Sequence, residues 1–203
     1  MDKVKTNSSK KNRYAWIAIG VIILLLALLS MIQQGIAKNR AAGMVKALQL
    51  VLPESTQISG AELDQMSAEG LPDVETAVIN DLPVMGEMLI PAIDVDVALI
   101  CDYSKDDLKK SPCIVSGSAA GRDLVIAGGS YKAQLASLNT LTRGDTVMIC
   151  DMNGRMFIYD VDSLEFADKE HALEISDAGC DLSLYCVSNN GSARYVARCT
   201  LCQ

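Results

Sequence analysis

The sequence predicts a small, mainly β domain that follows a single transmembrane helix. Residues 14–37 carry no charged side chain, and a helix of that length can cross a hydrocarbon core of about 30 Å. From residue 88 onward, short segments rich in valine and isoleucine alternate apolar and polar side chains, as half-buried strands do. Turn residues separate these segments, so the predicted fold is a closed, antiparallel-rich β-barrel with short helices.

The first 13 residues predict which side of the membrane each part of the chain occupies. The basic residues that precede the apolar run outnumber the acidic ones five to one: Lys3, Lys5, Lys10, Lys11 and Arg13 against Asp2. By the positive-inside rule, residues 1–13 form a cytoplasmic tail of a single-pass cell-membrane protein, and the C-terminal domain is extracellular. A cleavable signal peptide is the alternative. The apolar run is longer than the apolar region of a typical signal peptide, and no clear cleavage site follows it.

Residues 38–83 are expected to connect the transmembrane helix of residues 14–37 to the barrel. Residues 38–52 predict a juxtamembrane helix, because Ala41, Val45 and Leu48 recur on one helical face. Pro53 ends this helix. Residues 54–83 are acidic and punctuated by glycine and proline, which predicts a stalk with a short helix over 61–67 and little core of its own.

The barrel domain is assigned to residues 84–203. Its predicted strands cover residues 88–93, 96–101, 124–127, 146–151, 155–166, 182–187 and 193–201. Asn153-Gly154 is a strong signal for a two-residue hairpin turn. Residues 104–110 and 133–141 predict brief helices between strands.

Charge and histidine content exclude several kinds of function. Beyond residue 40, 11 lysines and arginines against 24 aspartates and glutamates leave a net charge of −13, which disfavours nucleic acid and anionic lipid as partners. An acidic face of this kind is mostly solvated surface, although it could attract a basic segment of a partner. The one histidine, His171, lies in a charged segment and is expected at the surface.

The seven cysteines predict neither a cofactor nor a metal site. An odd number in an exported chain leaves at least one thiol unpaired, and the spacings do not decide which cysteines pair. Cys199 and Cys202 form a C-x-x-C, but no second pair stands at zinc-finger spacing. Buried free thiols are expected for several of them.

Several motifs between Pro83 and Cys202 occur in a characteristic order. A strand pair, DLSLYCVSNNGSARYVARC, covers residues 181–199, and LVIAG covers residues 124–128. Further segments are GEMLIPAIDVDVAL at 86–99, SPCIVSGSA at 111–119 and LNTLTRGDTVMI at 138–149. Together they resemble sortases, the membrane-anchored cysteine transpeptidases of Gram-positive cell surfaces, and in particular those of clostridial type, class B/D-like. The resemblance implies an eight-stranded barrel.

The same resemblance indicates which residues of this chain stand at the catalytic positions. Its Thr-Leu-x-Thr-Cys signature falls on residues 183–187, so the nucleophile position holds Val187, and the base position after LVIAG holds Gly129. The arginine of the following strand corresponds to Arg194. Cys186 lies one residue before the nucleophile position, and adjacent strand residues point to opposite faces, so its thiol is expected to face away.

With the nucleophile and base positions replaced, the resemblance implies a degenerate sortase that binds its partner with little or no transpeptidation. Arg194 can hold a peptide carbonyl by charge-assisted hydrogen bonds, and the partners implied are a sorting-signal peptide, a pilin or an active sortase. Arg194 could instead form only an ion pair. The alternative function is an active transpeptidase that uses a displaced Cys186 with Arg194. A third interpretation is an active sortase altered in the laboratory.

Overall fold

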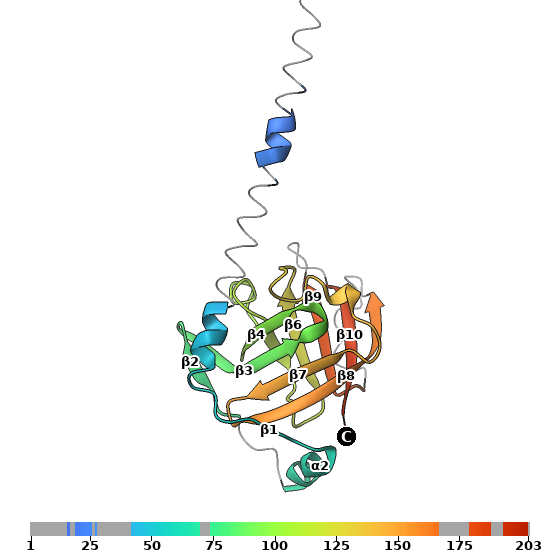
Figure 1. Ribbon diagram of the computed structural model, residues 1–203. Coiled ribbons are helices and arrows are strands. Elements are labelled where there is room, and N and C mark those ends of the chain that lie inside the picture. Colours follow the sequence, from blue (N-terminus) through green and yellow to red (C-terminus); the bar gives the residue numbers. More distant parts are fainter. Residues whose placement is uncertain are drawn as a thin grey trace, which may run out of the picture. The chain divides into compact units, whose positions relative to one another are not determined.

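The computed structural model (Figure 1) describes residues 16, 19–25, 27, 42–69, 74–166, 179–187 and 193–202. The described residues from 42 onward contain ten β-strands, two short 3-10 turns and two α-helices. The side chains of residues 66–69, 193 and 194 are outside the description. The chain divides into two units, Met1–Ile36 and Ala37–Gln203. The second unit contains all ten strands.

Eight of the strands close into a barrel. In chain order the strands are β1 (Thr56–Gln57), β2 (Ala77–Ile79), β3 (Leu82–Ile90), β4 (Val95–Ile100), β5 (Cys113–Ser116), β6 (Leu124–Gly129), β7 (Thr146–Asp151), β8 (Arg155–Phe166), β9 (Leu182–Val187) and β10 (Ala193–Leu201). They neighbour one another in the order β8-β10-β9-β6-β5-β4-β3, and β7 pairs with both β3 and β8, which completes the ring. The predicted eight-stranded barrel is therefore confirmed, with β1 and β2 added at β8 and β3.

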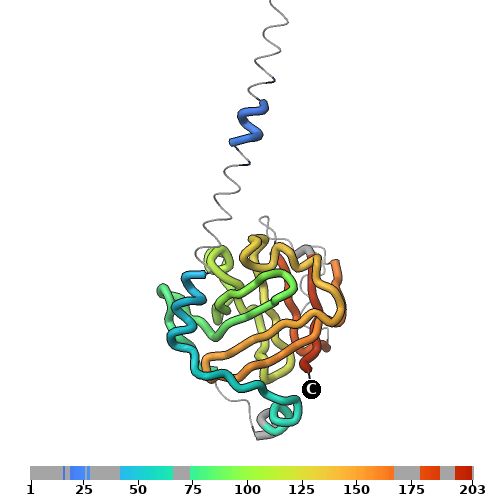
Figure 2. The backbone as a smooth tube through the Cα atoms, in the orientation of Figure 1, coloured from blue at the N-terminus to red at the C-terminus, as the bar shows by residue number. Residues whose placement is uncertain are grey.

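The strand predictions hold best in the C-terminal half. The bounds of β7, β8, β9 and β10 are those predicted from the sequence, and Figure 2 traces these strands in orange to red. β3 begins six residues earlier than predicted, and residues 91–93 form a 3-10 turn because Pro91 cannot donate to the ladder. The short strands β1, β2 and β5 were not predicted as strands.

The predicted helices between strands are wrong in part. Residues 104–110 form turns, in which Ser104 Oγ accepts from the Asp107 N–H at 3.0 Å and donates to the Asp107 carboxylate. Such local bonds of serine compete with a helix. In the predicted helix over 133–141, only the 3-10 turn η2 (Leu138–Thr140) is helical.

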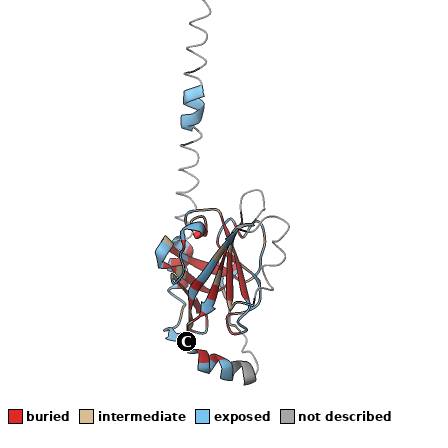
Figure 3. Ribbon diagram, turned by 90° about the vertical axis from the view of Figure 1, so that its right-hand side faces the viewer, coloured by how far each residue is buried: buried red, intermediate tan, exposed pale blue. Residues whose placement is uncertain are grey.

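Within the predicted stalk of residues 54–83, described residues from both 54–69 and 74–83 contact the barrel. The predicted helix over 61–67 is present as α2 (Gly60–Glu69), and a capping box begins it: the Ser59 N–H donates to Glu62 at 2.9 Å. Leu63 is fully buried in the barrel core, and β1 pairs with β8. Figure 3 shows the buried side of α2 and, above it, the barrel strands with their buried residues. The acidic composition of the segment gives no signal of this apolar burial.

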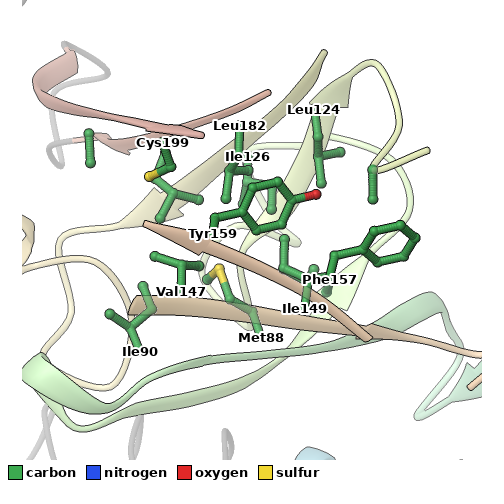
Figure 4. Close-up of a cluster of buried hydrophobic side chains, with 14 of the residues drawn as sticks. Met88, Ile90, Leu124, Ile126, Val147, Ile149, Phe157, Tyr159, Leu182 and Cys199 are labelled. Carbon is green, nitrogen blue, oxygen red and sulfur yellow. The ribbon is translucent and has the colours of Figure 1, made fainter. Parts of the chain in front are cut away.

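Two clusters of buried side chains lie on opposite sides of the barrel wall. The first fills the interior with residues such as Met88, Ile126, Phe157 and Tyr159 (Figure 4). The Tyr159 hydroxyl is buried there without a hydrogen-bond partner among the described residues. The second cluster lies under the helix of residues 42–48 and includes residues from the strands as well as from that helix: Met44, Leu48, Ile79, Leu82, Val84, Ala98, Ile100, Leu108, Cys113, Ala127, Met152 and Val187.

The helix of residues 42–48 corresponds to part of the predicted juxtamembrane helix. Val45 and Leu48, predicted to share its apolar face, are both buried, whereas Ala41 lies outside the described residues. Most of the predicted transmembrane segment, residues 14–37, also lies outside them; residues 19–25 are helical, with exposed side chains. Within the described part of the chain, no helix has the length and apolarity needed to span a membrane.

Glu87 is a buried carboxyl beneath the end of this helix. Its side chain is 7% exposed, and Gln49 Nε2 donates to Glu87 Oε1 at 3.3 Å. Burial, followed by a hydrogen bond and charge repulsion from Asp96, raises the pKa of Glu87 to about 7. Gln49 opposes this shift only in part. Near neutral pH, Glu87 therefore exchanges a proton beneath the helix.

Glu87 is expected to make the folded domain less stable as pH rises from 4.5 to 7. The unfolded carboxyl ionises near its ordinary pKa of 4.5, whereas the folded one holds its proton until about pH 7. The folded state therefore loses free energy relative to the unfolded state across that window, by about 3 kcal/mol in total, and the loss levels off above it. Urea unfolding of the full chain at pH 5, 6, 7 and 8 measures this change. Glu87→Gln should flatten the profile, and an unchanged slope in that variant would contradict the assignment.

Candidate functional site

The predicted nucleophile and base positions lie side by side in the barrel wall. β6 and β9 run parallel and pair in unbroken register from Leu124–Leu182 to Gly129–Val187. Gly129 is the last residue of β6 and Val187 the last residue of β9. The sheet therefore brings together two positions that are 58 residues apart in the sequence.

Cys186 and Val187 belong to different clusters. Cys186 is 5% exposed and packs in the barrel interior with Leu184, whereas Val187 is 8% exposed and packs in the second cluster with Ala127 and Leu108. Alternation along β9 accounts for this, since the β6–β9 register has no bulge that would turn Cys186 outward. The thiol at 186 therefore lies in the core.

Another thiol, that of Cys113, packs in the same cluster as Val187. It is fully buried, and burial raises its pKa to about 11. Cys113 Sγ donates to the Ser111 carbonyl at 3.5 Å. Since the thiolate is the nucleophilic form, Cys113 is protonated and unreactive near neutral pH.

Two side chains occupy the space that a side chain at residue 129 would enter. A Cβ atom placed on Gly129 would lie 2.8 Å from Tyr131 Cδ2 and 2.9 Å from Gln134 Oε1. Gln134 is 2% exposed, and its Oε1 accepts from the Gly129 N–H at 2.6 Å. Its Nε2 donates to the Leu108 carbonyl at 3.1 Å. A histidine at this position would have to displace both side chains.

Sequence reasoning missed Gln134. It lies in a segment that the sequence predicted as a brief helix between strands, where a glutamine carries no signal. Only the turn of residues 131–137, which follows β6 directly, brings it back to Gly129.

The structure describes the side chain of one of the two arginines of β10, Arg198, but not that of the other, Arg194. The Arg194 backbone lies in β10, but its side chain is outside the description, so its position relative to Val187 stays a prediction. Arg198 is described: its Nη1 donates to Ser183 Oγ at 2.9 Å, and its Nε pairs with Glu165 at 3.3 Å. Arg198 thus ties β8, β9 and β10 together. His171 also lies outside the described residues.

The described side chains of the site are mostly buried: Val187, Leu108 and Gln134 are each at most 8% exposed. These side chains are valine, tyrosine, leucine, glutamine and buried thiols, and the described residues contain no cluster of histidine, cysteine and carboxylate suited to a metal ion. Tyr185 lies at its edge, and burial together with the neighbouring Tyr103 raises its pKa to about 12, so its hydroxyl stays protonated. Hydrogen bonding and apolar contact are the interactions that these groups offer.

The fold and these motifs define the class of protein. The model of the sortase domain matches residues 88–201, and the chain belongs to the sortase family. A comparison with curated proteins gave no match.

Solved sortases share the fold at low sequence identity. A Clostridium perfringens sortase D5 transpeptidase is 14% identical, with a TM-score of 0.54 over 83% of this chain and 99% of that one. C. perfringens sortase C, in a structure with the C-terminal cell wall sorting motif, is 16% identical, with a TM-score of 0.52 over 72% and 92%. A lid mutant of Corynebacterium diphtheriae sortase A is 20% identical, with a TM-score of 0.51 over 84% and 94%.

Proposed function

We propose that the chain is a degenerate sortase that binds a sorting-signal peptide, a pilin or a partner sortase, with little or no transpeptidation. The observation that carries this proposal is the pairing of Gly129 with Val187 at the ends of β6 and β9. These are the positions to which the motif resemblance assigns the histidine base and the cysteine nucleophile. Catalytic groups that act as a unit lose several orders of magnitude in rate when one of them is removed.

Binding of an extended peptide can persist without catalysis. Arg194 retains the guanidinium that could hold a peptide carbonyl, and such charge-assisted bonds contribute about 1.5–3 kcal/mol each. The sorting motif present in the C. perfringens sortase C structure supplies a probe of the right chemistry.

Calorimetric titration of the full-length chain in detergent with this sorting-motif peptide tests binding. The wild type is expected to bind it in preference to a scrambled peptide, and Arg194→Ala should raise the Kd on the order of tenfold. Arg143→Ala, which removes an exposed guanidinium from the turn before β7, is the matched control and should leave the Kd unchanged. Equal heats for the sorting-motif and scrambled peptides would refute the proposal.

The proposed location is the outer face of a Gram-positive-type cell membrane. The uncharged run of residues 14–37, preceded by basic residues, supports a single-pass anchor with a cytoplasmic N-terminus. Alkaline carbonate extraction tests this: the full chain should stay with the membrane, and a chain without residues 1–37 should not. Release of the full chain by the same wash would contradict the anchor.

A further inference from the structure

Gln134 connects two backbone groups near the candidate site. Its carboxamide accepts from the Gly129 N–H at 2.6 Å and donates to the Leu108 carbonyl at 3.1 Å. With 2% of its surface exposed, it is one of the few buried polar side chains described. A buried carboxamide needs such partners, so the two bonds fix its position.

One of the two groups that Gln134 binds, the Gly129 N–H, is a group that a neighbouring β-strand would otherwise use, while the Gly129 carbonyl accepts from the Leu135 N–H at 3.3 Å. β5 accompanies β6 only as far as the Cys113–Ala127 pair, and Gly129 lies two residues beyond it. On the other side, Gly129 pairs with Val187 of β9. A carboxamide offers one carbonyl acceptor and an N–H donor, as a peptide unit does, so Gln134 supplies to the Gly129 N–H the acceptor that a strand would supply at this end of β6.

Leu108 links this bridge to Val187. Leu108 is 7% exposed and belongs to the same buried cluster as Val187 and Ala127. The bond to its carbonyl holds the turns of residues 104–110 against the ends of β6 and β9. Release of Gln134 would therefore free a backbone donor, a backbone acceptor and the apolar cover of Val187 together.

We infer that the Gln134 carboxamide is an internal substitute for a peptide group of the ligand, and that an extended peptide binds at the end of β6 by displacing it. This inference rests on the proposed peptide-binding function and adds that Gln134 regulates peptide binding by competing for the site. Extended peptides bind sheet edges through main-chain hydrogen bonds. Because the peptide binds only molecules in which Gln134 has left the site, the apparent Kd equals the intrinsic Kd divided by the fraction of such molecules.

Two readouts on the full-length chain test the displacement, both with the sorting-motif peptide as probe. In the wild type, saturating peptide should move the side-chain carboxamide NMR signals of Gln134 toward the position of a solvated glutamine. Gln134→Met keeps the length of the side chain and removes both bonds, and it should lower the Kd about tenfold or more. Asn139→Leu, at an exposed amide in the following turn, is the matched control and should leave the Kd unchanged.

The outcomes separate this inference from the proposed function. If the peptide binds both proteins with the same Kd and the Gln134 signals stay in place at saturation, the peptide binds elsewhere and displacement is refuted. If the peptide binds neither protein, the proposed function itself fails. The wild-type NMR readout does not depend on the folding of the Gln134→Met variant.

Discussion

Cys186 is expected to react with iodoacetamide at least about a thousandfold more slowly in the folded chain than in the denatured chain near pH 7. Its side chain is 5% exposed and packs among the interior residues of the barrel. Alkylation therefore requires an opening of the core, and opening free energies of core strands approach the global stability of about 5–15 kcal/mol. A thousandfold retardation corresponds to only about 4 kcal/mol of opening.

Other cysteines of the chain provide the controls for this measurement. Cys180 and Cys202 are partly exposed and should be labelled first, whereas Cys199 is fully buried, has a pKa raised to about 12 by burial, and should resemble Cys186. Mass spectrometry of proteolytic peptides after timed labelling gives each rate separately. Labelling of Cys186 at the rate of the denatured chain would favour the active transpeptidase with a displaced nucleophile.

Asp151→Ala should lower the free energy of unfolding by about 3–5 kcal/mol. Asp151 is 2% exposed and stabilises the turn between β7 and β8: its Oδ1 accepts from the backbone N–H groups of Asn153 and Arg155, each at 3.0 Å. Its Oδ2 pairs with Arg155 Nε at 2.7 Å. Removal of the carboxylate leaves a largely buried guanidinium and two N–H groups without these partners.

Denaturant unfolding of the full chain measures this effect. Asp160→Ala, which removes an exposed carboxylate from the same hairpin, is the control and should change stability by less than about 0.5 kcal/mol. If both variants showed the same small decrease in the free energy of unfolding, Asp151 would not stabilise the turn as described.

The local sequence pattern predicted the strands of the C-terminal half of the barrel, but it did not predict the short strands β1 and β2 that are added to the barrel. β7 to β10 alternate apolar and polar side chains, and Asn153-Gly154 lies in the turn that joins β7 to β8, so their bounds followed from sequence. β1 and β2 are two and three residues long, too short for a period to be visible. In residues 54–83 the core contacts of Leu63, Ile58 and Val74 are isolated apolar side chains in a polar segment, and only tertiary structure shows that they reach the core.

The sequence predicted which residues occupy the candidate site, but it did not predict which side chains surround them. Strand alternation placed Cys186 and Val187 on opposite faces, and they lie in different clusters. The parallel pairing of Gly129 with Val187 and the bridge from Gln134 to Leu108 depend on contacts between distant segments, which no local pattern encodes. The role of Arg194 stays a prediction.

A transpeptidation assay tests the central claim most directly. The full-length chain is incubated with the sorting-motif peptide and a glycine or lysine nucleophile, with an active sortase run alongside, and products are followed by mass spectrometry. Binding without turnover predicts no cleaved or ligated product above that formed by the peptide and nucleophile alone. Robust product formation that Cys186→Ala abolishes would contradict it.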